Sequence, residues 1–189
     1  GSWAPQQLPT VEPDFMMRLA ALYQRDPLLG PAIAEGMRAQ AMGEEVLGDD
    51  MKSPNALNGP RAIATASRNV GRLLAAADGP RIAVIELGGW DTHSGQGLAT
   101  GRLPTALKAM ADGLVALKEG LGQAWRQTVV LTATEFGRTV AANGTNGTDH
   151  GTASVAMMLG GAVAGGRVIA DWPGLAIERQ FERRDLAPT

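Results

Sequence analysis

Residues 79–93, GPRIAVIELGGWDTH, decide the fold that we predict for this chain. A Gly-Pro pair opens the stretch, the apolar run 81–87 (RIAVIEL) follows, and two glycines lead into residues 90–93 (WDTH). A short apolar run with β-branched residues between turn formers is typical of a buried strand. Residues 81–87 are therefore predicted to form a strand that delivers Asp91 and His93 to its carboxyl end.

The sequence downstream continues the pattern expected of alternating strands and helices. Leucine and methionine recur at steps of three and four between residues 103 and 121, which predicts a helix packed on a sheet. Residues 128–133 (TVVLTA) predict a second strand, and residues 155–159 (VAMML) form a third apolar segment. Strand, helix and strand in this order pair in parallel through a right-handed crossover. We therefore predict an α/β fold with a mostly parallel sheet and flanking helices.

The part of the chain before residue 81 differs from the rest. Residues 1–80 show helical spacing within 15–23, 33–41 and 63–74, which predicts a mainly helical lead-in packed on the same domain. Residues 81–189 are predicted to be the α/β core. With 189 residues, of which 44% are hydrophobic, the chain is long enough for one ordinary core.

Composition excludes several classes of function. The formal net charge is −2 with acidic and basic residues intermixed, which argues against binding to nucleic acid or to anionic lipid. Cysteine is absent, so oxygen and imidazole are the only metal donors. The apolar stretches are far shorter than the roughly 20 residues of a membrane-spanning helix.

Both histidines of the chain closely follow an acidic residue, as Asp91-Thr92-His93 and as Asp149-His150. Both clusters lie in glycine-rich loops near predicted strand ends, where ligands bind in open parallel sheets. Carboxylate and imidazole together suit zinc, manganese or iron. The alternative is that each aspartate caps a loop while each histidine makes an ordinary surface hydrogen bond.

Residues 134–139 (TEFGRT) supply two more candidates directly after the second predicted strand. The carboxylate of Glu135 is a possible metal ligand. The guanidinium of Arg138 is a possible oxyanion-binding group, because it presents several donors in a fixed fork. A local Glu135–Arg138 ion pair is the alternative interpretation.

Five segments of this chain occur in the order found in the DUF1501 family, which the chain resembles from about residue 81 onwards. The first 80 residues match that family only loosely. The segments are 88–93 (GGWDTH), 134–139 (TEFGRT), 143–151 (NGTNGTDHG), 158–166 (MLGGAVAGG) and 172–173 (WP).

The resemblance implies a fold similar to alkaline phosphatases, sulfatases and cofactor-independent phosphoglycerate mutases. It also implies metal-dependent hydrolysis of a small phosphate or sulfate ester, with zinc or manganese as the metal. By analogy, Asp91 and His93 are ligands of the first metal, although only one residue separates them where alkaline phosphatases have three. Asp149 and His150 admit two alignments: an Asp-His pair on the second metal, or His150 alone completing the first site with Glu135 as the acidic ligand.

Three further expectations follow from the resemblance. The chain corresponds to the C-terminal half of such a protein, so that the nucleophile and an early aspartate ligand belong to an N-terminal half. This chain alone is therefore expected to carry an incomplete site, with weak or no catalysis. Family members often carry export signals, which places the protein in the periplasm or outside the cell. A noncatalytic binding or structural module on the same scaffold is the alternative to an enzyme.

Two Asn-Gly-Thr triplets begin at Asn143 and Asn146. Each fits the acceptor pattern for N-glycosylation. Asn-Gly pairs are also ordinary turn formers, and we prefer that interpretation.

Overall fold

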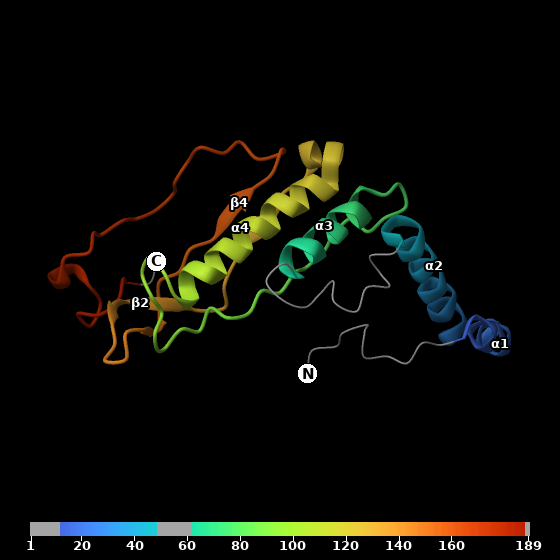
Figure 1. Ribbon diagram of the computed structural model, residues 1–189, viewed down its shortest axis with the longest axis horizontal. Helices are drawn as coiled ribbons and strands as arrows, with labels where there is room; N and C mark the ends of the chain where they lie inside the picture. Colours follow the sequence, from blue (N-terminus) through green and yellow to red (C-terminus); the bar gives the residue numbers. More distant parts are fainter. Residues whose placement is uncertain (1–11, 49–61, 188–189) are drawn as a thin grey trace.

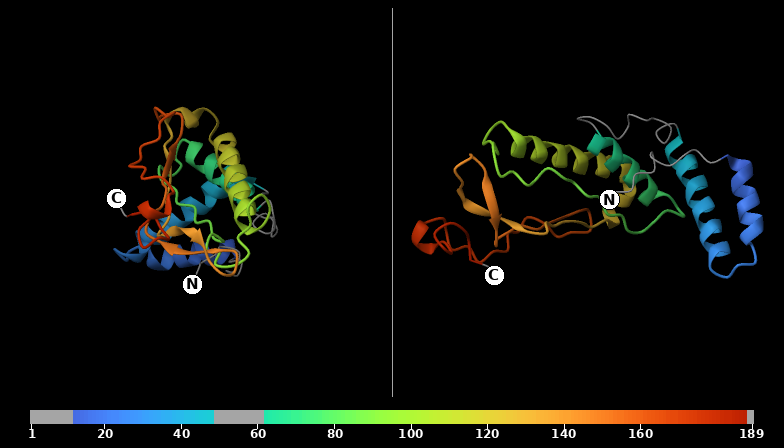
Figure 2. Two further views of the ribbon diagram at one scale, coloured as in Figure 1. Left: turned by 90° about the vertical axis from the view of Figure 1, so that its left-hand side faces the viewer. Right: turned by 90° about the horizontal axis from the view of Figure 1, so that it is seen from below.

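The computed structural model describes residues 12–48 and 62–187. Helices account for 45% of the described residues and strands for 11%. The molecule is elongated, with helices α1 (Pro13–Tyr23) and α2 (Leu29–Leu47) at one end and the hairpin of strands β2 (Gly137–Ala142) and β3 (Thr148–Gly151) toward the other (Figures 1 and 2). The helices are α1 (Pro13–Tyr23), α2 (Leu29–Leu47), α3 (Ala62–Ala75) and α4 (Arg102–Leu121), with 3-10 turns η3 (Gly122–Gln127) and η4 (Ile177–Arg179).

The prediction of an α/β fold with a mostly parallel sheet is wrong. Strand β1 (Val130–Thr132) pairs antiparallel with β4 (Met157–Leu159), and β2 (Gly137–Ala142) pairs antiparallel with β3 (Thr148–Gly151). These are the two sheets of the described residues, and each has two strands. The physical reason is the hairpin of β2 and β3 that lies between β1 and β4 in the sequence: the chain reverses direction there, so β4 returns beside β1 in the opposite direction.

The first predicted strand, residues 81–87, forms no strand. Among the described residues, the backbone of residues 82–89 has no hydrogen-bond partner. Ile82 is 83% exposed and Val84 is 91% exposed. The run therefore remains an extended segment with its apolar side chains in solvent, and it contributes nothing to the core.

This exposure makes a testable prediction for the segment. Changing Ile82 and Val84 together to threonine is expected to leave the melting temperature unchanged and to lower the fluorescence of a bound hydrophobic dye, because apolar surface already in solvent is removed. Leu117→Ala is the matched control for a buried residue, with an expected loss of about 2–5 kcal/mol. A double variant that melts at a clearly lower temperature than the parent chain would contradict this placement.

Helix α4 forms where the leucine and methionine spacing predicts it, but it packs on a helix and not on a sheet. Its most extensive contact is with α3, which lies along it in Figure 1. The buried apolar side chains of the described residues all belong to α4: Ala116, Leu117 and Leu121. Leu107, in the same stripe, is 46% exposed, so only the C-terminal part of the stripe is covered.

Local signals explain where the helices begin and end. Asp26, in the turn before α2, accepts hydrogen bonds from the backbone N–H groups of Leu28 and Leu29 at 2.9 and 2.8 Å, which satisfies two N–H groups where the helix begins. Gly122 follows α4 at φ 52°, a left-handed conformation in which glycine avoids the strain of a side chain.

Among the described residues, no helix combines the length and the apolar character required to span a membrane.

Candidate metal centre

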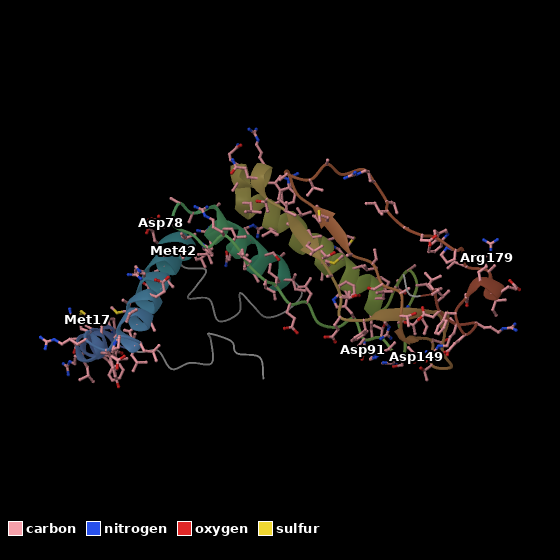
Figure 3. The ribbon with its side chains drawn as sticks, turned by 180° about the vertical axis from the view of Figure 1, so that it is seen from behind. Met17, Met42, Asp78, Asp91, Asp149 and Arg179 are labelled. Atoms are coloured by element: carbon pink, nitrogen blue, oxygen red, sulfur yellow. The ribbon has the colours of Figure 1, made fainter. Side chains whose placement is uncertain are left out.

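Three segments bring the predicted polar residues together at one end of the molecule. Asp91 and His93 lie in the loop before α4, Arg138 lies in β2, and His150 lies in β3. Arg138 and His150 are direct partners in the β2–β3 register. Figure 3 shows Asp91 and Asp149 close together at this end. The antiparallel β2–β3 hairpin thus brings together residues that were predicted to meet at the edge of a parallel sheet.

One carboxylate oxygen, Oδ1 of Asp91, is the centre of this cluster. It lies 3.0 Å from Nε2 of His93 and 3.0 Å from Nε2 of His150. The guanidinium of Arg138 also donates to it. The two imidazole rings are 4.9 Å apart between centroids, so both rings crowd around the same oxygen.

The donor set of Asp91, His93 and His150 fits a divalent cation. One ligand atom from each residue lies within 4.8 Å of the other two. Zinc binds imidazole nitrogen and carboxylate oxygen at about 2.0–2.2 Å, which separates tetrahedral ligands by about 3.3 Å. The two 3.0 Å separations are close to that value, so a small adjustment accommodates an ion. The side chains are 48–54% exposed, which leaves the centre accessible from solvent.

Asp149 lies behind His93. Its Oδ1 is 3.1 Å from Nδ1 of His93 and accepts a hydrogen bond from the side-chain amide of Asn143 at 3.0 Å. The hydrogen bonds from Asn143 and His93 outweigh partial desolvation and hold the pKa of Asp149 below its ordinary value. Asp149 is therefore an ionised partner for the far nitrogen of His93, the position in which metal proteins commonly place an orienting carboxylate.

The ionisation of Asp91 has a different balance of causes. Partial desolvation acts to raise the pKa of Asp91, but hydrogen bonds from Arg138 and His150 outweigh it, and the pKa lies below the ordinary value. The carboxylate is therefore negatively charged at neutral pH. An anionic oxygen is the form that binds a hard or borderline cation.

Arg138 is the least exposed charged side chain of the cluster, at 23%. Besides Asp91, it donates from Nε to Oγ1 of Thr148 at 3.1 Å and to the Thr148 carbonyl. Glu135 lies in the loop between β1 and β2 and does not belong to the group of converging ligand atoms in the described chain. Arg138 pairs with Asp91 and not with Glu135. The Glu135–Arg138 ion pair, which was the alternative interpretation of the sequence, therefore does not form.

Two supporting contacts were not predicted from the sequence. Phe136 stacks on His150 with ring centroids 4.2 Å apart and an interplanar angle of 23°. Thr92, 1% exposed, and Thr148 both donate to Oε1 of Gln96, at 2.7 and 2.8 Å. The sequence signals for these contacts are an aromatic residue directly after Glu135 and threonines within two residues of the motif histidines, and neither signal is specific.

One protein family matches nearly the whole of this chain. The family model described as DUF1501, protein of unknown function, matches residues 6–189, a range that contains every residue of the cluster. No curated protein and no solved structure matches the chain. Because the family match covers nearly all of the 189 residues, the chain belongs to the DUF1501 family.

Proposed function

We propose that this protein binds a divalent cation, zinc or manganese, through Asp91, His93 and His150. The observation that supports the proposal is the approach of two imidazole Nε2 atoms to one ionised carboxylate oxygen, each at 3.0 Å. A ring nitrogen and a carboxylate oxygen at this distance need a proton or a cation between them. A single cation satisfies both contacts at once.

We further propose that the bound cation serves the hydrolysis of a phosphate or sulfate ester. Such a cation polarises an ester oxygen and lowers the pKa of water. This reaction class is the one that the motifs shared with the DUF1501 family imply, and the cationic Arg138 beside the ligands suits an anionic substrate. A shallow depression of ≈ 550 Å³ is lined by Gly89 and Gly95, in the loop that carries Asp91 and His93, and by the start of α4.

Arg138 binds the anionic oxygens of the ester in this proposal. A guanidinium has five N–H groups, and three of them are used by Asp91 and Thr148, which leaves two for a substrate. The bonds to Thr148 hold the side chain in place when Asp91 turns to the cation. A planar fork of donors held in this way recognises phosphate and sulfate oxygens in pairs.

The test begins with the metal. We expect zinc or manganese calorimetry and elemental analysis to show stoichiometric binding by the protein and loss of that binding in His93→Ala and His150→Ala. Circular dichroism checks that both variants keep their helices. Hydrolysis of p-nitrophenyl phosphate and p-nitrophenyl sulfate is then measured with metal and with a chelator.

The outcomes separate the functions that have been considered. Metal binding with chelator-sensitive hydrolysis supports the hydrolase. Metal binding without hydrolysis of either ester, both in this chain and in a longer chain that includes the expected N-terminal half, contradicts that reaction and favours a noncatalytic binding module. A protein that takes up neither metal contradicts the proposed site itself.

A further inference from the structure

We propose that Asn143 is a positioning residue of this centre, which directs Nε2 and not Nδ1 of His93 toward Asp91 and the cation. The proposal rests on the proposed metal site and adds to it a residue that does not contact the metal. Asn143 follows β2 directly, at the start of the turn that leads to β3. From there its side chain reaches both the backbone of His93 and the carboxylate behind the His93 ring.

The amide nitrogen of Asn143 donates one hydrogen to His93 and the other to Asp149 behind the His93 ring. One bond goes to the His93 carbonyl at 2.8 Å, and the other goes to Oδ1 of Asp149 at 3.0 Å. The same Asp149 oxygen lies 3.1 Å from Nδ1 of His93. Asn143 therefore restrains the main chain of His93 and, through Asp149, the orientation of its ring.

The amide oxygen of Asn143 shows why the side chain cannot turn around. It accepts hydrogen bonds from the backbone N–H groups of Thr145 and Gly147, each at 3.0 Å. Backbone N–H groups only donate, so oxygen must face them. The two amide hydrogens must then face His93 and Asp149.

The turn and the metal-ligand loop are held together at several further points. The Thr145 hydroxyl donates to the His93 carbonyl at 2.6 Å, and Gly95 N–H donates to the Thr145 carbonyl at 3.0 Å. Thr148 N–H donates to the Thr92 carbonyl at 3.2 Å. These contacts keep the loop around His93 beside the turn, so that Asn143 acts on a fixed target.

The consequence for His93 follows from its two ring nitrogens. A carboxylate on Nδ1 keeps a proton on that nitrogen and leaves the lone pair of Nε2 for the cation. Without the Asn143 amide, Asp149 loses the donor that holds its Oδ1 at the ring. The ring then turns more freely about its bond to Cβ, and either nitrogen faces Asp91.

Asn143→Asp separates this role from the folding of the turn. The aspartate keeps an oxygen for the N–H groups of Thr145 and Gly147, but it has no hydrogen to donate to Asp149 or to the His93 carbonyl. Asn146→Asp is the matched control, because it adds the same charge to the same turn at a left-handed position, φ 56°, that aspartate tolerates. Circular dichroism verifies that both variants fold.

The experiment has a metal-free arm and a metal-loaded arm. With only two histidines in the chain, long-range ¹H–¹⁵N spectra resolve each ring, and His150→Ala identifies His93. In metal-free protein at alkaline pH, with Asp91→Asn introduced into every version so that no carboxylate faces Nε2 of His93, we expect the His93 proton on Nδ1 in the parent chain and in Asn146→Asp. We expect a mixture of tautomers in Asn143→Asp.

In protein loaded with ¹¹³Cd, we expect coupling to Nε2 of His93 in the parent chain and in Asn146→Asp. Asn143→Asp is expected to lose this coupling and about 10- to 100-fold in affinity, the usual effect of removing a residue that orients a ligand. A His93 proton on Nδ1 in Asn143→Asp, as in the parent chain, overturns the role of Asn143 whether or not metal binds. Absence of cadmium and zinc binding by the parent chain, with the tautomer difference intact, contradicts the metal site and not the positioning.

Discussion

Asp91→Asn is expected to lower zinc affinity by more than about 100-fold, which exceeds the usual effect of removing an orienting residue. Asp91 Oδ1 is the one atom that both histidine Nε2 atoms and Arg138 approach. The amide keeps the shape of the side chain but removes the negative charge, so a divalent cation would be left beside the positive charge of Arg138. Calorimetry with zinc measures the loss.

Two further aspartate variants make this result specific. Asp112→Asn, which removes an exposed carboxylate paired with Lys108 on α4, is expected to bind zinc like the parent chain. Asp149→Asn is expected to lose less affinity than Asp91→Asn, because Asp149 contacts His93 at Nδ1 and lies outside the converging group. Equal losses for Asp91→Asn and Asp149→Asn would instead make Asp149 a ligand, as in the alignment that places the Asp149-His150 pair on a metal.

The pairing of acidic residues with histidines was the most informative signal in the sequence. It predicted that Asp91, His93, Asp149 and His150 share one site. The structure brings ligand atoms of Asp91, His93 and His150 together, while Asp149 contacts the Nδ1 atom of His93. The orienting contact of Asp149 depends on which side of the His93 ring each carboxylate occupies, and spacing along the chain does not encode that. Asn143 looked like an ordinary turn former because its oxygen does form the turn, while its nitrogen makes the contacts that matter to the site.

Helices were easier to predict than strand pairing for a physical reason. The stripe of α4 is a local pattern, and its C-terminal part is buried at Leu117 and Leu121. An apolar run such as 81–87 specifies a preference for extended backbone, but a strand exists only where another strand accepts its hydrogen bonds. The partner strand is distant in the sequence, so a local pattern does not reveal it. Strand β1 pairs with β4 and not with residues 81–87.

Gly71→Ala in α3 is expected to destabilise the fold by about 1–3 kcal/mol, the usual cost of forcing extra atoms into a packed contact. A methyl group at Gly71 would lie 2.6 Å from the carbonyl oxygen of Leu117 and 2.8 Å from the backbone nitrogen of Leu121. These are backbone atoms of α4 and cannot move aside alone, so the two helices must separate. Chemical denaturation followed by circular dichroism measures the change.

The sign of this change is its most useful feature, because an alanine normally stabilises a helix interior by about 0.5–1 kcal/mol relative to glycine. Gly36 in α2 is the matched control: it is exposed, and a methyl group there meets nothing within 4 Å. Gly36→Ala is therefore expected to stabilise the protein while Gly71→Ala destabilises it. If both variants stabilised the protein, α3 and α4 would not be in close contact in solution. Helix α3 would then not cover the small core at Ala116, Leu117 and Leu121.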